Sequence, residues 1–250
     1  MFSRPSVLVL LFILAGLSAC SGGSGTPTVV VENEAGTPIA AATATPTPPE
    51  NLVQNGDFQQ HWQQGWERFI GETIEGQSVT EVVETTAANS GKAIRLNHNG
   101  PTELRISQFI TMTTLDVTLR AKINLSAEST CWGLLRACTG LAGFVLTLHP
   151  QRDTTEATLG QLVWLNADRY NEDQYFESSG SQNYTFVKPG WYTIDLNLQE
   201  AIIDRLPAVD STQVQAVSIT LIAGTSGECK TGECPAEIHA ADIELLHITP

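Results

Sequence analysis

The sequence has few basic residues and few charged residues of any kind. Lys and Arg together number 13 against 27 Asp and Glu, which gives a formal net charge of −14, and charged residues make up only 16% of the chain. A chain this acidic, with no basic run, is poorly suited to phosphate backbones, so nucleic acid is excluded as a partner. The low charge content also argues against sustained helical bundles, which usually need far more Glu, Lys and Arg.

Catalytic motifs are also missing. The five His residues are scattered, and the chain contains no H-E-x-x-H, no G-x-S-x-G and no phosphate-binding Gly-rich loop. Glycoside hydrolysis needs two carboxylates about 5–10 Å apart across a cleft. The adjacent Glu172 and Asp173 would point to opposite faces of a strand, so they do not form such a pair. The sequence therefore predicts that the protein is not an enzyme.

No apolar run is long enough to span a bilayer, which takes about 20 residues. The longest, residues 7–17 (VLVLLFILAGL), has the length of a signal-peptide core and is followed by Leu17-Ser18-Ala19-Cys20. That tetrapeptide resembles the lipobox of bacterial lipoproteins. The resemblance implies a signal peptide over 1–19, acylation of Cys20, and export to the cell envelope with the domain outside the cytoplasmic membrane. The membrane would then be a partner through the lipid anchor. An ordinary secretory peptide with an incidental Cys20 is the alternative.

Residues 20–50 have the composition of a linker. This stretch is rich in Pro and Thr and ends in TATPTPPE. Pro removes backbone donors, and the segment has too few large apolar residues to form a core. The sequence therefore predicts a disordered stalk that holds the following domain away from the membrane. Its one apolar patch, residues 29–31 (VVV), could pair transiently as a strand.

Residues 51–250 form one predicted domain with a period-two pattern. In 115–125 (LDVTLRAKINL) every second residue is apolar, and the residues between are polar. Such alternation is typical of antiparallel sheets with one wet face. Only 199–206, before Pro207, has a helical pattern. The predicted fold is an all-β antiparallel β-sandwich (jelly roll), with strands at 78–84, 92–97, 104–110, 115–125, 142–148, 160–166, 192–198, 214–223 and 237–248.

Several short motifs occur in a fixed order along this domain. Residues 51–58 read NLVQNGDF and are followed by Trp66; GKAIRL, SQFI, PGWYTIDLNL and ADIELLHI come later in that order. This series resembles carbohydrate-binding modules of the galactose-binding-like jelly-roll superfamily and spans the whole domain. The resemblance implies an opening strand at 51–58, a non-catalytic glycan-binding function, and structural, core-packed roles for Trp66 and Trp191.

The same resemblance implies a structural Ca²⁺ near the first and last strands. The candidate ligands are Asp57 and Asp242, since Ca²⁺ takes 6–8 oxygen ligands. Two departures weaken this expectation: Gln59 stands where the family usually has Glu, and Ile243 replaces the second acid after Asp242. In the alternative interpretation, Asp57 and Asn55 close a turn with their side chains.

Four cysteines remain once Cys20 is set aside, and four cysteines allow three pairings. Both close pairs enclose turn-like sequence. We therefore expect the local disulfides Cys131–Cys138 and Cys229–Cys234, which suit an oxidising compartment. Zinc is the alternative, but the spacings are not C-x2-C and no His lies close in sequence.

Aromatic side chains suggest where a sugar could bind, because flat rings pack against pyranose faces while polar groups bind hydroxyls. Trp164 lies between apolar neighbours and is expected to be buried. Trp132 lies between the first two domain cysteines, where it is either a rigid exposed anchor or buried. The polar loop 168–184 carries both kinds of group, although a solvated hairpin loop is the simpler explanation. The predicted ligand-binding residues are Trp132, Arg169, Tyr170, Asn171, Asp173, Gln174 and Tyr175.

Two functions of different class follow from these observations. The first is a membrane-anchored surface lipoprotein that displays a non-catalytic glycan-binding β-sandwich, with polysaccharide or cell-wall glycan as its partner. The second is a structural or protein-interaction module of the same fold with no sugar site, because a fold does not fix its function.

Overall fold

The computed structural model describes residues 31–32, 38–39, 49–71, 77–100, 102–128, 139–167, 180–226 and 235–248. The chain divides into two units, Met1–Thr47 and Pro48–Pro250. In the first, β1 (Val31–Glu32) pairs antiparallel with β2 (Pro38–Ile39), a short pair within the linker that was expected to be disordered. No helix in the described part of the chain has the length and apolar character needed to cross a membrane.

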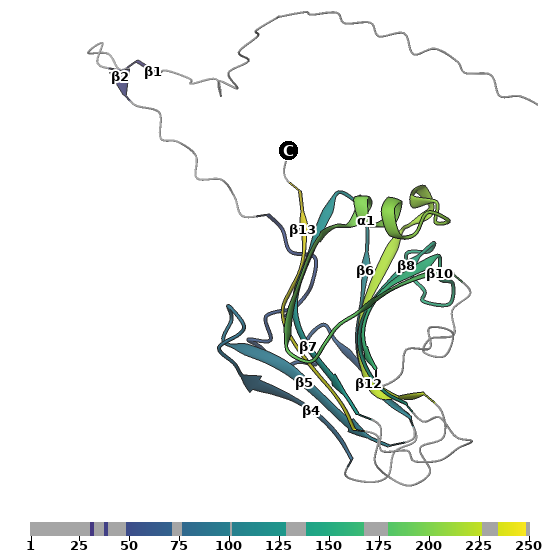
Figure 1. The fold of residues 1–250 in the computed structure, drawn as a ribbon. Helices are drawn as coiled ribbons and strands as arrows, with labels where there is room; N and C mark the ends of the chain where they lie inside the picture. Colours follow the sequence, from purple (N-terminus) through teal and green to yellow (C-terminus); the bar gives the residue numbers. More distant parts are fainter. Residues whose placement is uncertain are drawn as a thin grey trace, which may run out of the picture. The chain divides into compact units, whose positions relative to one another are not determined.

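The second unit contains two stacked sheets, which confirms the predicted β-sandwich. Figure 1 shows β13, β7, β5 and β4 in one layer and β6, β12, β8 and β10 in the other. The six-stranded sheet has the order β10 (Ser181–Phe186), β9 (Gly160–Ala167), β8 (Thr139–His149), β12 (Ala216–Ser226), β6 (Glu103–Thr111) and β3 (Glu67–Ile70). The five-stranded sheet has the order β11 (Trp191–Asn197), β7 (Val117–Ala127), β13 (Pro235–His247), β5 (Lys92–Asn99) and β4 (Ser78–Glu84).

Alternation decides which side chains face the core. In β7 the buried positions are every second residue from Val117 to Leu125, while Arg120 is exposed and Lys122 and Asn124 are partly exposed on the other face. The inner residues of β12 and β8 alternate in the same way and pack in one large cluster with those of β7 and β13. Burial of this apolar half of each strand drives the two sheets together.

Among the described residues, helical structure occurs only in the connection between β11 and β12. The helix α1 spans Leu198–Arg205, close to the predicted 199–206, and begins where the Asn197 side chain accepts a hydrogen bond from the Glu200 amide (3.0 Å). A short 3₁₀ helix, η2, follows at Ser211–Gln213 and is capped by Asp210. The buried face of α1 carries Leu198, Ala201 and Ile202, so the helix closes one end of the core.

The nine predicted strands all correspond to observed strands, but β3 and β10 were not predicted. The edge strand β10 pairs parallel with β9, an exception to the antiparallel pattern. Its residues Ser181–Tyr184 were expected to belong to the polar loop 168–184. Neither β3 (ERFI) nor β10 (SQNYTF) has the clear apolar alternation by which the other strands were found.

The opening motif 51–58 is held by turns rather than by a strand. Asn51 forms an isolated bridge with Leu246, and its side-chain oxygen accepts hydrogen bonds from the amides of Val53 and Leu245 (both 3.0 Å). Gly56 is required because a Cβ there would meet the carbonyl oxygen of Ile243 at 2.0 Å. The turn places Phe58, which is fully buried, in the core. The opening strand implied by the resemblance is therefore reduced to a single bridge.

The burial of the tryptophan side chains agrees with the sequence predictions for Trp66 and Trp164 but not for Trp191. Trp66 and Trp164 are 3% and 2% exposed, as predicted, and Trp62 is buried beside them in the same cluster. The core position expected for Trp191 is wrong, because its side chain is 40% exposed. The physical reason is that β11 is an edge strand and Trp191 shares the outer face with Asn124, its partner on β7.

Replacing Trp66 should test this core. The Trp66 ring lies 5.7 Å from that of Phe58, and its indole Nε1 has no hydrogen-bond partner among the described residues. Trp66→Ala should lower the free energy of unfolding by about 3–5 kcal/mol, because it removes a buried aromatic ring. Trp66→Phe should cost clearly less in urea denaturation followed by circular dichroism. Equal losses in both variants would contradict a role based on ring volume.

Candidate functional site

A groove of about 730 Å³ runs over the outer face of the six-stranded sheet. Its floor comes from β6, β12, β8 and β9, and the edge strand β3 forms one side. We call it the sheet groove. The side chains that line it and carry its chemistry are Glu67, Phe69, Glu103, Arg105, Ser107, Phe109, Thr147, His149, Gln161, Ser218 and Thr220.

A polar row crosses the floor of the sheet groove. Strand register places Ser218 between Phe109 and Thr147, and Thr147 opposite Gln161. The Gln161 side chain donates from Nε2 to the Thr147 hydroxyl (3.2 Å), and its Oε1 accepts from the side-chain Nε2 of Gln182 (3.0 Å). These hydrogen bonds hold hydroxyl and amide groups in fixed positions at the surface of the sheet.

A buried imidazole orients one of these hydroxyls. His149 Nδ1 lies 2.9 Å from the carbonyl oxygen of Ala157, and Nε2 lies 2.9 Å from Ser218 Oγ. The carbonyl only accepts, so Nδ1 donates to it, and the Nε2 of the neutral ring accepts from the hydroxyl. Burial lowers the pKa of His149 below its ordinary value, against the opposing effect of the Ala157 hydrogen bond. The ring is therefore neutral at neutral pH, and the lone pairs of Ser218 remain for other donors.

An exposed aromatic ring stands at the β3 side of the groove. Phe69 is 48% exposed, and the guanidinium carbon of Arg105 lies 4.3 Å from its ring centroid. Arg105 also pairs with Glu103 at 3.3 Å. The stacked guanidinium restricts the ring from one side, so Phe69 presents a partly fixed aromatic surface to solvent.

Away from the polar row, the outer face of the same sheet becomes apolar. Val145, Val163, Leu165 and Ile222 are at most 3% exposed and form a second buried cluster. The rings of Tyr184 and Phe186 on β10 pack against this cluster and stack on each other at 6.2 Å. The polar groups of this outer face are thus concentrated on β6, β12 and the part of β8 that lines the sheet groove.

The charges in the sheet groove balance. Glu67 and Glu103 are matched by Arg68 and Arg105, and His149 is neutral. An uncharged ligand with many hydroxyl groups suits such a surface, because its hydroxyls can both donate and accept. A strongly charged ligand would not be attracted, because the sheet groove has no net charge of opposite sign.

The seven residues predicted to bind ligand lie outside the described residues. These are Trp132, Arg169, Tyr170, Asn171, Asp173, Gln174 and Tyr175. Cys20 and the four cysteines expected to form disulfides, Cys131, Cys138, Cys229 and Cys234, also lie outside them. The predictions for these residues therefore remain untested.

The residues of the sheet groove were missed by sequence reasoning. Alternation in 103–111 does mark Arg105, Ser107 and Phe109 as facing away from the core. The signal was present, but alternation does not say which outer face forms a groove. His149 and Ser218 are 69 residues apart, so only the pairing of β8 with β12 brings them together.

The two candidate calcium ligands are described, and both line a cavity of about 360 Å³. Asp57 Oδ1 accepts from the Gln59 amide (3.2 Å), and Asn55 Oδ1 accepts from the Gln60 amide (3.1 Å), which is the turn-closing arrangement. The Asp242 carboxylate accepts from the amides of Asn89 (2.6 Å) and Ser90 (3.1 Å). The Lys122 ammonium lies 3.3 Å from the same carboxylate.

This arrangement does not fit a calcium site. Calcium needs several oxygen ligands, whereas the Asp242 carboxylate is already bonded by two backbone amides, the Ser90 side chain and the Lys122 ammonium. Burial raises the pKa of Asp242, but the Asn89 and Ser90 hydrogen bonds outweigh it and bring the pKa below its usual value. Among the described residues, no three His, Cys, Asp or Glu side chains are grouped to hold a metal ion. The calcium prediction itself stays untested.

No protein-family model matches this chain, and no curated protein is similar to it in sequence. Solved structures do show some likeness. A family 61 carbohydrate-binding module solved with β-1,4-galactotriose is 12% identical with a TM-score of 0.38, covering 80% of this chain and 99% of that chain. The family 11 module of a Clostridium thermocellum cellulosomal cellulase is 12% identical with a TM-score of 0.39, covering 82% and 97%.

A third likeness is to an enzyme. The enzymatically active domain of bacteriophage CBA120 tailspike protein 4 is 12% identical with a TM-score of 0.40. The alignment covers 79% of this chain and 21% of that chain, so this chain spans about a fifth of its length. At these identities and TM-scores, no ligand or activity of the three proteins is transferred to this chain.

The neutral His149 predicts a pH dependence of stability. The unfolded chain protonates this histidine near pH 6.5, whereas the folded chain does so only at lower pH. Its contribution to stability is therefore complete above about pH 6.5 and is lost as the pH falls below that value. The melting temperature should decline from pH 7 to pH 5, and His149→Gln should reduce the slope. An unchanged slope in the variant would contradict the neutral, hydrogen-bonded ring.

Proposed function

We propose that the sheet groove binds an uncharged polysaccharide, and that the protein is a non-catalytic glycan-binding module. The observation that carries this proposal is the combination, in one groove of about 730 Å³, of an exposed aromatic ring with a row of fixed hydroxyl and amide groups. Sugars need both, because their C–H faces are apolar and their edges carry hydroxyls.

The aromatic contribution comes from Phe69. Aromatic contacts are worth about 0.5–1.5 kcal/mol beyond the area they bury. Because Arg105 already restricts the ring, its ordering on binding costs little. A pyranose ring packed on Phe69 would then direct its hydroxyls toward Ser107 and Thr220, which lie next to each other in register.

Hydrogen bonding is preorganised on the floor of the groove. Ser218 is held by His149, and Thr147 by Gln161, so neither hydroxyl has to change its position to meet a ligand. Exposed hydrogen bonds contribute only about 0.5–1.5 kcal/mol each, so several have to act together for specificity. The row across β6, β12, β8 and β9 supplies several.

The Ser218–His149 pair has the hydrogen bond of a nucleophile and its base, but its surroundings support a non-catalytic role. Ser218 lies within β12, between β6 and β8. Its backbone amide belongs to the strand ladder, so it is not available to stabilise an oxyanion, which acyl transfer at a serine requires. The pair is better explained as a fixed part of the groove floor.

Phe69→Ala should weaken glycan binding without unfolding the domain. The loss of one stacking ring should reduce retention about 3- to 10-fold in affinity electrophoresis through galactan, mixed-linkage glucan or hydroxyethyl cellulose. The melting temperature should change little, because Phe69 lies half-exposed on an edge strand.

Ile203→Ala is the matched control, since Ile203 is an exposed apolar residue on α1 (61%) that does not line the sheet groove. It should leave retention unchanged. If the wild-type protein is retained by none of these polysaccharides, the glycan proposal fails. A structural or protein-interaction module then becomes the better explanation.

We further propose that the protein is exported and anchored at the bacterial cell envelope by lipid on Cys20. The support is the sequence alone: an apolar segment of signal-peptide length, the Leu-Ser-Ala-Cys tetrapeptide, and the Pro/Thr-rich stretch that follows. One acyl chain binds a membrane only marginally, whereas several hold it stably.

Cys20→Ala should prevent acylation and move the protein from the membrane fraction to the soluble fraction. Metabolic labelling with a clickable fatty acid, followed by fractionation, measures both effects in one experiment. Cys131→Ala serves as a cysteine control that should keep the label. A Cys20 variant that keeps both the label and its place in the membrane fraction would show that the lipobox interpretation is wrong.

A further inference from the structure

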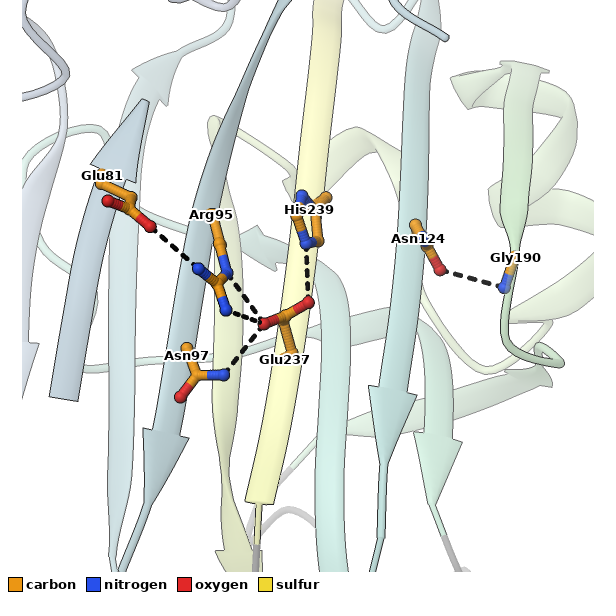
Figure 2. A network of polar contacts seen from close by, with 7 residues as sticks. All are labelled: Glu81, Arg95, Asn97, Asn124, Gly190, Glu237 and His239. Carbon is orange, nitrogen blue, oxygen red and sulfur yellow. Dashed lines mark hydrogen bonds and ion pairs between the residues drawn. The ribbon is translucent and has the colours of Figure 1, made fainter. Parts of the chain in front are cut away.

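A line of side chains crosses the outer face of the five-stranded sheet, on the other side of the sandwich from the sheet groove. Strand register places one residue from each of the five strands in this line. We call it the cross-strand row; in order from β4 to β11 it consists of Glu81, Arg95, His239, Asn124 and Trp191. Figure 2 shows the first four pointing to the same side of the sheet.

Glu237 lies on β13 two residues before His239, on the same face of the sheet, and hydrogen-bonds side chains in the middle of the row. Its Oε2 accepts from Arg95 Nε (2.8 Å) and Nη2 (2.6 Å) and from Asn97 Nδ2 (2.9 Å), as Figure 2 shows. Its Oε1 accepts from His239 Nε2 (2.7 Å). Arg95 also donates to Glu81 (3.0 Å). Burial raises the pKa of Glu237, but these hydrogen bonds outweigh it and bring the pKa to about 2.

Trp191 is held at the end of the row. Its ring lies edge-on to the His239 ring, with centroids 6.3 Å apart. Asn124, between them, accepts from the Gly190 amide (2.9 Å; Figure 2) and so fixes the turn before Trp191, where Gly190 has φ +125°. Trp191 is nevertheless 40% exposed. It therefore combines an open aromatic face with a restrained position.

The hydrogen bonds of the row do not use every polar atom of its side chains. Asn124 accepts from Gly190 through Oδ1, so its Nδ2 is a donor that this bond does not use, and His239 contacts Glu237 through Nε2 and not through Nδ1. Asn124 lies opposite Trp191 in register, and His239 lies one strand further along the row. Three strand spacings separate Trp191 from Arg95, a span of about 14 Å.

We propose that the cross-strand row is a second glycan-binding surface, in which one uncharged sugar ring stacks on Trp191 and the adjoining sugars contact Asn124, His239 and Arg95. This inference goes beyond the proposed function of the sheet groove and stands on different residues. Each of the charged side chains Glu81, Arg95 and Glu237 already lies in an ion pair, and carboxylates outnumber the guanidinium, so an uncharged polyol suits the row better than an anion.

The composition of the row favours a sugar over a protein partner. The centre of a protein interface is depleted of charged residues and enriched in aromatic ones. Here the centre is Arg95 with Glu237 and His239, and the single exposed aromatic ring is at one end. The side chains of the row are already held by hydrogen bonds, so they lose little conformational entropy when a ligand binds. A hydroxyl-rich ligand that makes only weak contacts can therefore still bind.

The test uses two neighbouring aromatic residues. Trp191 and Tyr192 are both 40% exposed, but they alternate across β11, so only Trp191 belongs to the row. In affinity electrophoresis of the full chain through galactan, mixed-linkage glucan and hydroxyethyl cellulose, Trp191→Ala should reduce retention about 3- to 10-fold. Tyr192→Ala should not. Trp191→Tyr keeps an aromatic ring and should retain most of the binding.

Comparison with Phe69→Ala separates the two sites. If Trp191→Ala and Trp191→Tyr both behave like Tyr192→Ala while Phe69→Ala weakens retention, the second surface is overturned and the sheet groove stands. If Trp191→Ala weakens retention and Phe69→Ala does not, the second surface is supported and the sheet groove fails. Wild-type protein that binds none of the three polysaccharides, or binding lost equally in Trp191→Ala and Tyr192→Ala, overturns the second surface.

Discussion

The alternation of apolar and polar side chains along each strand is the constraint on which both faces of the sandwich depend. Strands β12 and β13 lie between two partners each, and their inner residues pack at the centre of the core. Since successive side chains point to opposite faces, burying one half of each strand leaves the other half outside, in register with its neighbours. The sheet groove and the cross-strand row are two products of the same geometry. In both, polar groups stand on strands whose positions the core has already fixed.

The loop between β4 and β5 limits how much of the five-stranded sheet is open. Its residues Asn89 and Ser90 donate their backbone amides to Asp242, and Lys122 donates to the Ala87 carbonyl (2.9 Å). Beneath it, Ala88 packs on Ala93 and Ala241, which are fully buried although they lie on the outer face. An internal ammonium–carboxylate pair thus holds this loop on the sheet. The cross-strand row begins where that cover ends.

Much of the fold was predictable, because the period-two pattern marked nine strands and a separate helical pattern marked α1, the only α-helix among the described residues. Strands β3 and β10 escaped detection because both are edge strands, and an edge strand needs less apolar alternation than a central one. The exposure of Trp191 was missed for a different reason. Its core role was taken from the resemblance, although alternation along the strand places Trp191 on the same face as Thr193 and Asp195, which is the outer face of the sheet. The site was harder still, since His149 meets Ser218 only through strand pairing, and a groove is a property of a whole face.

The bulge in β13 has a consequence for how this strand tolerates change. Pairing with β7 shifts between Ala241 and Glu244, and Asp242 there adopts φ +48°. Before the bulge the even-numbered residues Ile238 and Ala240 face the core, whereas after it the odd-numbered Ile243 and Leu245 do. The alternation of core-facing and outward-facing residues therefore shifts by one residue at the bulge. If the same residues formed a regular strand without the bulge, Ile243 and Leu245 would turn to the outer side of the sheet. The extra residue at Asp242 therefore keeps the apolar residues of both segments on the core side.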